Sequence, residues 1–138
     1  MLWTPSMIYL VNYLCDKYFR LFDSGDVQDE NHYRNIITLA RHAPGVKIWM
    51  PSREVRTIQN VHRQMVRDCI EFPKNLVPRI SANLIDGKPP AGFEFTSSVV
   101  ADPAEATCVA QQQKNKCDGE VANCRACWED RHVSYPLH

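Results

Sequence analysis

Hydrophobic residues recur with two different periods along most of this chain, and the two periods alternate. Spacings of three and four are typical of a helix with one buried face, whereas short runs of apolar and β-favouring residues are typical of strands. Helices are predicted at residues 6–18, from a cap at Asp29 to Ala40, and at 53–71; strands are predicted at 18–22, 46–50, 76–85 and 93–100. This alternation indicates an α/β fold with a small, mostly parallel sheet of about four strands and flanking helices.

Two loops that follow predicted strands carry polar side chains. Asp23, Ser24 and Asp26 come after the first strand, and Ser52 and Arg53 come after the second. Ligands commonly bind at this end of an α/β sheet, but the same residue types also form Asx turns and helix caps. We favour the structural role, with Ser52 as the N-cap of the helix at 53–71.

Residues 108–138 follow a different pattern, since their sizeable apolar side chains are few and scattered. The segment holds four cysteines in the order C-x8-C-x6-C-x2-C: Cys108, Cys117, Cys124 and Cys127. Burial of so few apolar groups cannot offset the entropy lost on ordering the segment, whereas four thiolates on one metal centre could, because metal binding then becomes folding free energy. We expect a single domain over 1–138, with an α/β scaffold at 1–107 and an irregular metal-binding tail packed on it.

The cysteine spacing is compatible with two kinds of metal site. Iron-sulfur clusters use four thiolates, and Cys124 and Cys127 supply one close pair. Structural zinc prefers two close pairs, or Cys with His at short spacing, so the wide gaps slightly favour a cluster over zinc. His132 and His138 are possible replacement ligands, but we expect both to be incidental because four thiols complete a set.

Trp128, Cys15 and Cys69 also have roles that the sequence can suggest. Trp128 either shields the metal centre from water or anchors the tail on the sheet. Cys15 and Cys69 lie on predicted helix stripes, where we expect them to be buried as small core residues.

Composition narrows the possible partners. The chain has 138 residues and a net charge of zero, which argues against a protein that neutralises many phosphates. Arg53, Arg56, Arg63 and Arg67 share one side of a predicted helix, but such a run is usually a solvated face, so a nucleic-acid partner is disfavoured.

The N-terminal segment has neither a signal-peptide pattern nor the length of a membrane span. We therefore expect no membrane association and reduced thiols in the cytoplasm, that of the host if the protein is viral.

Three stretches together resemble a known family. FRLFDSGDV at 19–27, VKIWMPSRE at 46–54 and NCRACWEDRHVSYPLH at 123–138 are similar to a phage-encoded family labelled gene product eighty-eight, whose members are regarded as small viral iron-sulfur proteins. The resemblance implies a [4Fe-4S] cluster held by Cys108, Cys117, Cys124 and Cys127. The chain lacks the C-x3-C-x2-C spacing that leaves one iron open for S-adenosylmethionine, so radical chemistry is not expected.

These expectations lead to three candidate functions. We favour a bacteriophage redox protein that, in the manner of a ferredoxin, passes single electrons to an unknown redox partner and turns over no substrate. The alternative is a binding module whose zinc-stabilised tail supports contact with nucleic acid or a host protein. An enzyme using the loops at Asp26 and Ser52 ranks last, because the sequence supplies positions for it but no reaction.

Overall fold

The computed structural model describes residues 3–114, 116–117 and 124–137, and it confirms the α/β class. Five strands form a parallel sheet in the order β1-β2-β3-β4-β5, which is one strand more than the sequence predicts. The chain divides into two compact units, Met1–Pro78 and Arg79–His138, called unit 1 and unit 2 below. The boundary between them lies within β3 (Leu76–Ile85), whose bounds are those predicted.

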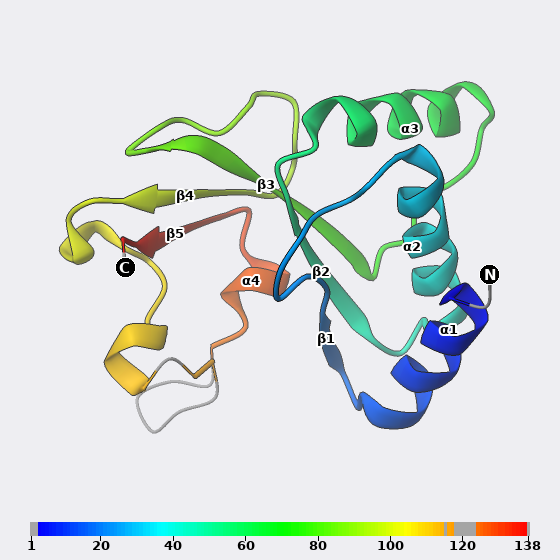
Figure 1. Ribbon diagram of the computed structural model, residues 1–138, viewed down its shortest axis with the longest axis horizontal. Helices are drawn as coiled ribbons and strands as arrows, with labels where there is room; N and C mark the ends of the chain where they lie inside the picture. Colours follow the sequence, from blue (N-terminus) through cyan, green and yellow to red (C-terminus); the bar gives the residue numbers. More distant parts are fainter. Residues whose placement is uncertain (1–2, 115, 118–123, 138) are drawn as a thin grey trace. The chain divides into compact units, whose positions relative to one another are not determined.

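Unit 1 has a conventional hydrophobic core of helices and short strands. It contains α1 (Trp3–Leu14), β1 (Tyr18–Arg20), α2 (Glu30–His42), β2 (Lys47–Ser52), α3 (Val55–Arg67) and the start of β3. β1 and β2 pair in parallel, with Phe19 opposite Ile48. α2 packs against both α1 and α3 and lies between them in Figure 1. Its predicted apolar stripe is buried: Tyr33, Ile36, Ile37 and Ala40.

The starts of the helices depend on local hydrogen bonds. Asp29 caps α2 as predicted, because its side chain accepts a hydrogen bond from the His32 amide. The prediction for Ser52 is wrong, since this residue ends β2 and Glu54 occupies the N-cap position of α3 without a side-chain hydrogen bond. The Ser52 hydroxyl nevertheless accepts a hydrogen bond from the Glu54 amide, so it still orders the turn between strand and helix.

The expected burial of the two helix-stripe cysteines also fails. α3 ends at Arg67 rather than at residue 71, and Cys69 lies in the following turn with a φ of 55°. Its side chain is therefore exposed rather than buried. Cys15 comes just after the end of α1 and is half-buried.

Unit 2 is built on parallel strands joined by the cysteine-bearing segment. β4 (Thr96–Val100) pairs in parallel with the β3 residues that follow Arg79 and, along its whole length, with β5 (His132–Pro136). Adjacent parallel strands need a crossover connection. From β4 to β5 this connection runs through η1 (Pro103–Glu105), η2 (Ala110–Gln113) and α4 (Ala126–Glu129). Figure 1 shows the chain leaving β4 in yellow and returning through orange α4 to red β5.

The sequence predicted an irregular tail, and this prediction is wrong for its end, which forms a strand. Its last described residues form β5, in which Val133 is completely buried. β-branched and aromatic residues such as Val133 and Tyr135 favour a strand once a neighbouring strand offers a partner, and β4 does so here. Nowhere in the described part of the chain is there a helix with the length and apolar composition that a membrane crossing requires.

Candidate metal centre

The four candidate ligands all belong to unit 2. Cys127 is buried in α4, whereas Cys108, Cys117 and Cys124 are half-buried. All six cysteines of the chain lie within the described residues, and none forms a disulfide. The thiols are therefore available as ligands rather than consumed by pairing.

The backbone of β5 holds Cys108 close to the group that contacts Cys127. The Ser134 amide donates to the Thr107 hydroxyl at 2.9 Å, and the Cys108 amide donates to the Ser134 carbonyl oxygen at 3.0 Å. The next residue of the strand, Tyr135, places its hydroxyl oxygen 3.2 Å from the Cys127 sulfur. Cys108 and Cys127 are distant in the sequence, yet they contact two consecutive residues of β5, Ser134 and Tyr135.

A second set of backbone bonds relates Cys117 to Cys124. Lys114 ends η2 with a φ of 58°, and the buried Gln113 side chain closes the turn by donating from Nε2 to the Lys116 carbonyl oxygen at 2.7 Å. Cys117 follows directly. The Cys124 amide then donates to the Cys117 carbonyl oxygen at 2.7 Å, while α4 begins two residues later and carries Cys127. Cys117 and Cys124 are therefore joined directly through their backbones, whereas Cys108 and Cys127 are related only through neighbouring residues of β5.

The pKa of the Cys127 thiol is shifted by its burial and by the groups around it. Burial raises the pKa of Cys127 to about 11, the Tyr135 hydrogen bond and the Arg79 charge act in the opposite direction, and the charges of Cys108 and Cys117 raise it further. Within residues 3–114, 116–117 and 124–137, no set of three or more Cys, His, Asp or Glu side chains has the geometry of a metal site. Four thiols nevertheless fit a cluster or zinc by the chemistry of the donor set.

Arg79 is the important residue that the sequence interpretation missed. Its side chain is completely buried, and among the described residues its guanidinium donates hydrogen bonds to backbone carbonyl oxygens. The acceptors are Thr96, Ala126, Cys127 and Asp130, at distances from 2.6 to 3.2 Å. Three of these belong to α4 or directly follow it, so Arg79 fixes the short helix that carries Cys127. A charge inside an otherwise buried strand was the signal that could have found it, because a buried charge must be compensated.

The other tail residues with open interpretations have clearer surroundings. The two ring nitrogens of His132 lie 2.9 Å from the Thr96 hydroxyl and 3.2 Å from the Ser98 hydroxyl, so the ring is hydrogen-bonded to β4. His138 lies outside the described residues. Trp128 is buried directly after Cys127, as both the shielding and the anchoring role require.

The polar loops of unit 1 serve structure. The Asp26 carboxylate accepts hydrogen bonds from the Ser52 hydroxyl at 2.5 Å and from the Arg53 amide at 2.7 Å. These bonds join the loop after β1 to the end of β2. The structural role favoured from the sequence therefore accounts for Asp26 and Ser52. The arginines of the basic helix face, Arg53, Arg56, Arg63 and Arg67, are exposed.

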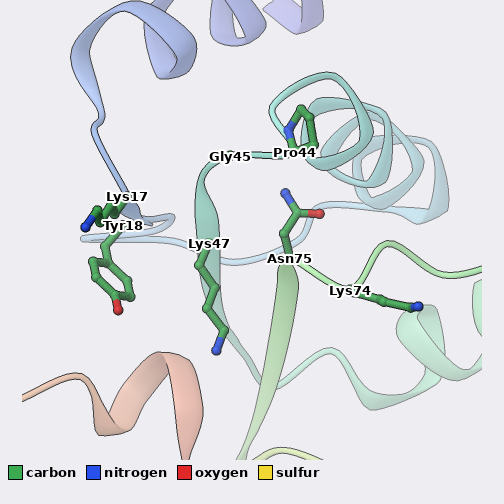
Figure 2. Close-up of a pocket in the computed structure, with 7 residues that line it drawn as sticks. All are labelled: Lys17, Tyr18, Pro44, Gly45, Lys47, Lys74 and Asn75. Carbon is green, nitrogen blue, oxygen red and sulfur yellow. The ribbon is translucent and has the colours of Figure 1, made fainter.

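Unit 1 also contains an open depression of about 460 Å³ where its strands begin. Figure 2 shows its lining residues, among them Lys17, Lys47 and Lys74. The three lysine side chains point in different directions in this view, and the Lys74 ammonium lies 3.7 Å from a Glu71 carboxylate oxygen. The Asn75 amide donates to three carbonyl oxygens of its own unit, those of Ala40, Ala43 and Val46. The depression is therefore positively charged, but its lysine and asparagine side chains do not converge on one point where a ligand could bind.

One family of known proteins matches this chain. The model of that family, described as Gene product 88, matches residues 7–130, a range that includes all four candidate ligands and Arg79. No curated protein and no solved structure matches.

Proposed function

The chain belongs to the Gene product 88 family of phage gene products, and we propose that it is an electron carrier whose four tail cysteines bind a [4Fe-4S] cluster. The observation that supports the proposal is the set of hydrogen bonds that ties the four cysteines in pairs within unit 2. Cys127 is buried in α4, Cys108 is tied to the strand that contacts it, and Cys117 and Cys124 are tied to each other. Thiolates alone, with one close pair, are the ligand set of such clusters.

The residues around Cys127 suit a redox centre. Burial of the ligand and hydrogen bonds to its sulfur are the features through which a protein tunes a cluster potential. Cys127 has both, since Tyr135 contacts its sulfur and Trp128 is buried beside it. When bound, the cluster would supply one-electron oxidation and reduction. The chain itself holds the ligands and limits the access of water to them.

Transfer of electrons to a protein partner explains the structure better than turnover of a substrate. Asp26 and Ser52, the loop residues that an enzyme could have used, are hydrogen-bonded to each other. We expect the protein to act in the host cytoplasm, where thiols stay reduced.

Metal and sulfide analysis of the protein purified without oxygen tests the proposal. We expect about four iron atoms and about four acid-labile sulfides per chain, and a paramagnetic signal after reduction with dithionite. The matched control is Cys69→Ser, which alters an exposed cysteine of unit 1 and should leave the iron content unchanged. Iron content that falls in Cys127→Ser but not in Cys69→Ser supports the site. A protein with one zinc and no sulfide would reject the cluster.

The lysine-lined depression favours a second candidate, a zinc-stabilised module that contacts nucleic acid or a host protein. Lys17, Lys47 and Lys74 line it together, and among its lining residues in the described chain none is acidic. Phosphate binding by lysines weakens steeply with salt, because counterions are released. Retention on DNA that falls with salt, and that is lost on changing the three lysines to glutamine, would favour this module. Equal retention of the triple variant would exclude the depression as the contact surface.

A further inference from the structure

Arg79 carries a positive charge whose burial is only partly compensated by the groups that contact it. Its guanidinium is completely buried, yet the acceptors of its hydrogen bonds are neutral carbonyl groups. Among the described residues, no carboxylate forms an ion pair with it. Asp130 offers Arg79 its carbonyl oxygen, and the charge of its exposed carboxylate compensates only part of the desolvation that lowers the pKa of Arg79. Buried charges in proteins are normally paired with an opposite charge or bound to a metal site.

The Cys127 thiol is a candidate for the rest of the negative charge, because its charge is among those that act on Arg79. Arg79 donates from both Nε and Nη2 to the carbonyl oxygen of Cys127, so the cation is in contact with the residue that carries the buried thiol. Phe95 covers it from another side, with the ring centroid 5.8 Å from the guanidinium carbon. Four thiolates contribute four negative charges, and a dipositive core cancels only two of them. The loaded centre therefore has a net charge of the sign that Arg79 requires.

We propose that Arg79 is the internal counter-charge of the metal centre: it stabilises the anionic, thiolate-bound centre and favours the state with one additional electron. This inference rests on the proposed function. The electron comes from a reduced partner protein and enters the cluster core, and the net charge of the centre then becomes more negative by one. A fixed buried cation stabilises the reduced form more than the oxidised form, because the attraction grows with the charge. Arg79 thereby raises the reduction potential.

A purely structural role is the competing explanation. As a clamp, Arg79 would matter only for the carbonyl groups of α4, and its loss would weaken the protein equally with and without metal. As a counter-charge, it should be needed by the loaded protein and be unfavourable in the metal-free protein, where the buried cation has only the Asp130 charge to compensate it in part. The two roles therefore predict opposite effects on the metal-free form.

Two substitutions separate charge from hydrogen bonding. Arg79→Gln removes the charge but keeps N–H donors, whereas Arg79→Lys keeps the charge but loses the planar fork of donors. The control is Arg131→Gln, which removes an exposed charge from the same unit. For each full-length variant, iron and sulfide content, midpoint potential, and thermal midpoints of the loaded and metal-free protein are measured.

We expect Arg79→Gln to shift the reduction equilibrium toward the oxidised form by roughly tenfold, which for one electron is about 59 mV. Cluster retention should fall roughly tenfold to a hundredfold, as for other residues that support metal ligands. The metal-free glutamine variant should melt at the same temperature as metal-free wild type or above it. Arg79→Lys should keep a potential closer to wild type, and Arg131→Gln should not change it.

Each contrary result has a distinct meaning. Equal potentials in wild type and Arg79→Gln, or a metal-free glutamine variant that melts lower or does not fold, would overturn the counter-charge role and leave the clamp. Arg79→Gln could fold but bind no cluster. In that case, cluster binding by Arg79→Lys supports the counter-charge role, and an Arg79→Lys variant that also binds no cluster overturns it. Wild type that binds no metal at all rejects the proposed function itself, which the first measurement shows separately.

Discussion

The two units differ most in what they bury. Unit 1 encloses large apolar side chains from three helices and its strands, including Tyr33, Ile36, Leu39, Ile48 and Ile58, and its buried polar residue in the described chain is Ser52. Unit 2 buries few apolar side chains: Ile80, Ala82, Val100, Cys127, Trp128 and Val133. It buries nearly as many polar ones: Arg79, Ser97, Ser98, Gln113 and Ser134.

This difference indicates two sources of stability. Burial of apolar area, at about 25 cal/mol per Å², is sufficient reason for unit 1 to stay folded. Polar side chains gain little net free energy on burial even when they are hydrogen-bonded. Unit 2 therefore needs an additional contribution, and a centre bound by its four thiols is the one that its composition offers.

Loss of the proposed metal centre is the change with the largest expected effect on this comparison. In Cys127→Ser, or after chelation of wild type, the amides of β4, β5 and α4 should lose protection against hydrogen exchange by several kcal/mol, because binding energy is folding energy. The amides of α2 and α3 should keep theirs. Exchange followed by mass spectrometry resolves the two units, and Cys69→Ser serves as the unaffected control. Full protection of β4 and β5 without metal would remove the distinction between the units.

A cavity in unit 1 should have the complementary effect. Ile58 on α3 is completely buried, so Ile58→Ala should lower the free energy of unfolding of unit 1 by about 2 to 5 kcal/mol. Val66 lies on the same helix but is 78% exposed, and Val66→Ala should change stability by less than about 0.5 kcal/mol. Urea unfolding of both variants measures the difference, and iron content should stay at the wild-type value in each. A large loss of iron in Ile58→Ala would show that the two units are not independent in this respect.

The same contrast explains which features could be predicted from the sequence. The buried stripe of α2 and the bounds of β3 follow from periodicity, because burial imposes the pattern locally. β5 was missed because a short run such as HVSYP becomes a strand only through its pairing with β4, which lies far away in the sequence. The end of α3 was missed because a single left-handed residue, Cys69, turns the chain.

The four cysteines could be proposed as ligands from the sequence, and they stay a prediction, whereas the residues that surround them could not be found in this way. Cysteine spacing points to the thiols because their chemistry is specific to residue type. Nothing in the order of residues shows that Arg79 meets the carbonyl group of Cys127, 48 positions away, or that Tyr135 reaches the sulfur of the same residue. Such contacts depend on how the crossover from β4 to β5 folds back, and no local pattern encodes them.

A smaller effect is expected from the hydrogen bonds that join the loops of unit 1. Asp26→Ala removes the acceptor of the Ser52 hydroxyl and the Arg53 amide, and it should lower the free energy of unfolding by about 1 to 3 kcal/mol. Asp23→Ala is the matched control, since Asp23 lies in the same loop and its side chain is 95% exposed. Denaturant unfolding measures both. If Asp26→Ala left stability unchanged, the structural role of Asp26 would be wrong and a ligand-binding role would return.

The smallest expected effect is a pH dependence confined to unit 1. Burial lowers the pKa of His62 below its ordinary value of 6.5, and the Tyr33 hydroxyl lies 2.8 Å from the His62 Nε2 atom. Between the lowered folded-state pKa and 6.5, the unfolded chain binds a proton that the folded chain does not. Stability should therefore fall as the pH drops below 6.5, level off below the folded-state pKa, and show no contribution from His62 above 6.5.

Urea unfolding of two single-tryptophan variants can assign this dependence to one unit, because the tryptophan kept is Trp49 of unit 1 in one variant and Trp128 of unit 2 in the other. The transition reported by Trp49 should weaken with acid, and adding His62→Gln should flatten that slope because the replaced side chain takes up no proton. A slope that persists in His62→Gln would assign the acid sensitivity to another group. A slope reported equally by Trp128 would mean that protonation of one histidine loosens both units, which their different cores give no reason to expect.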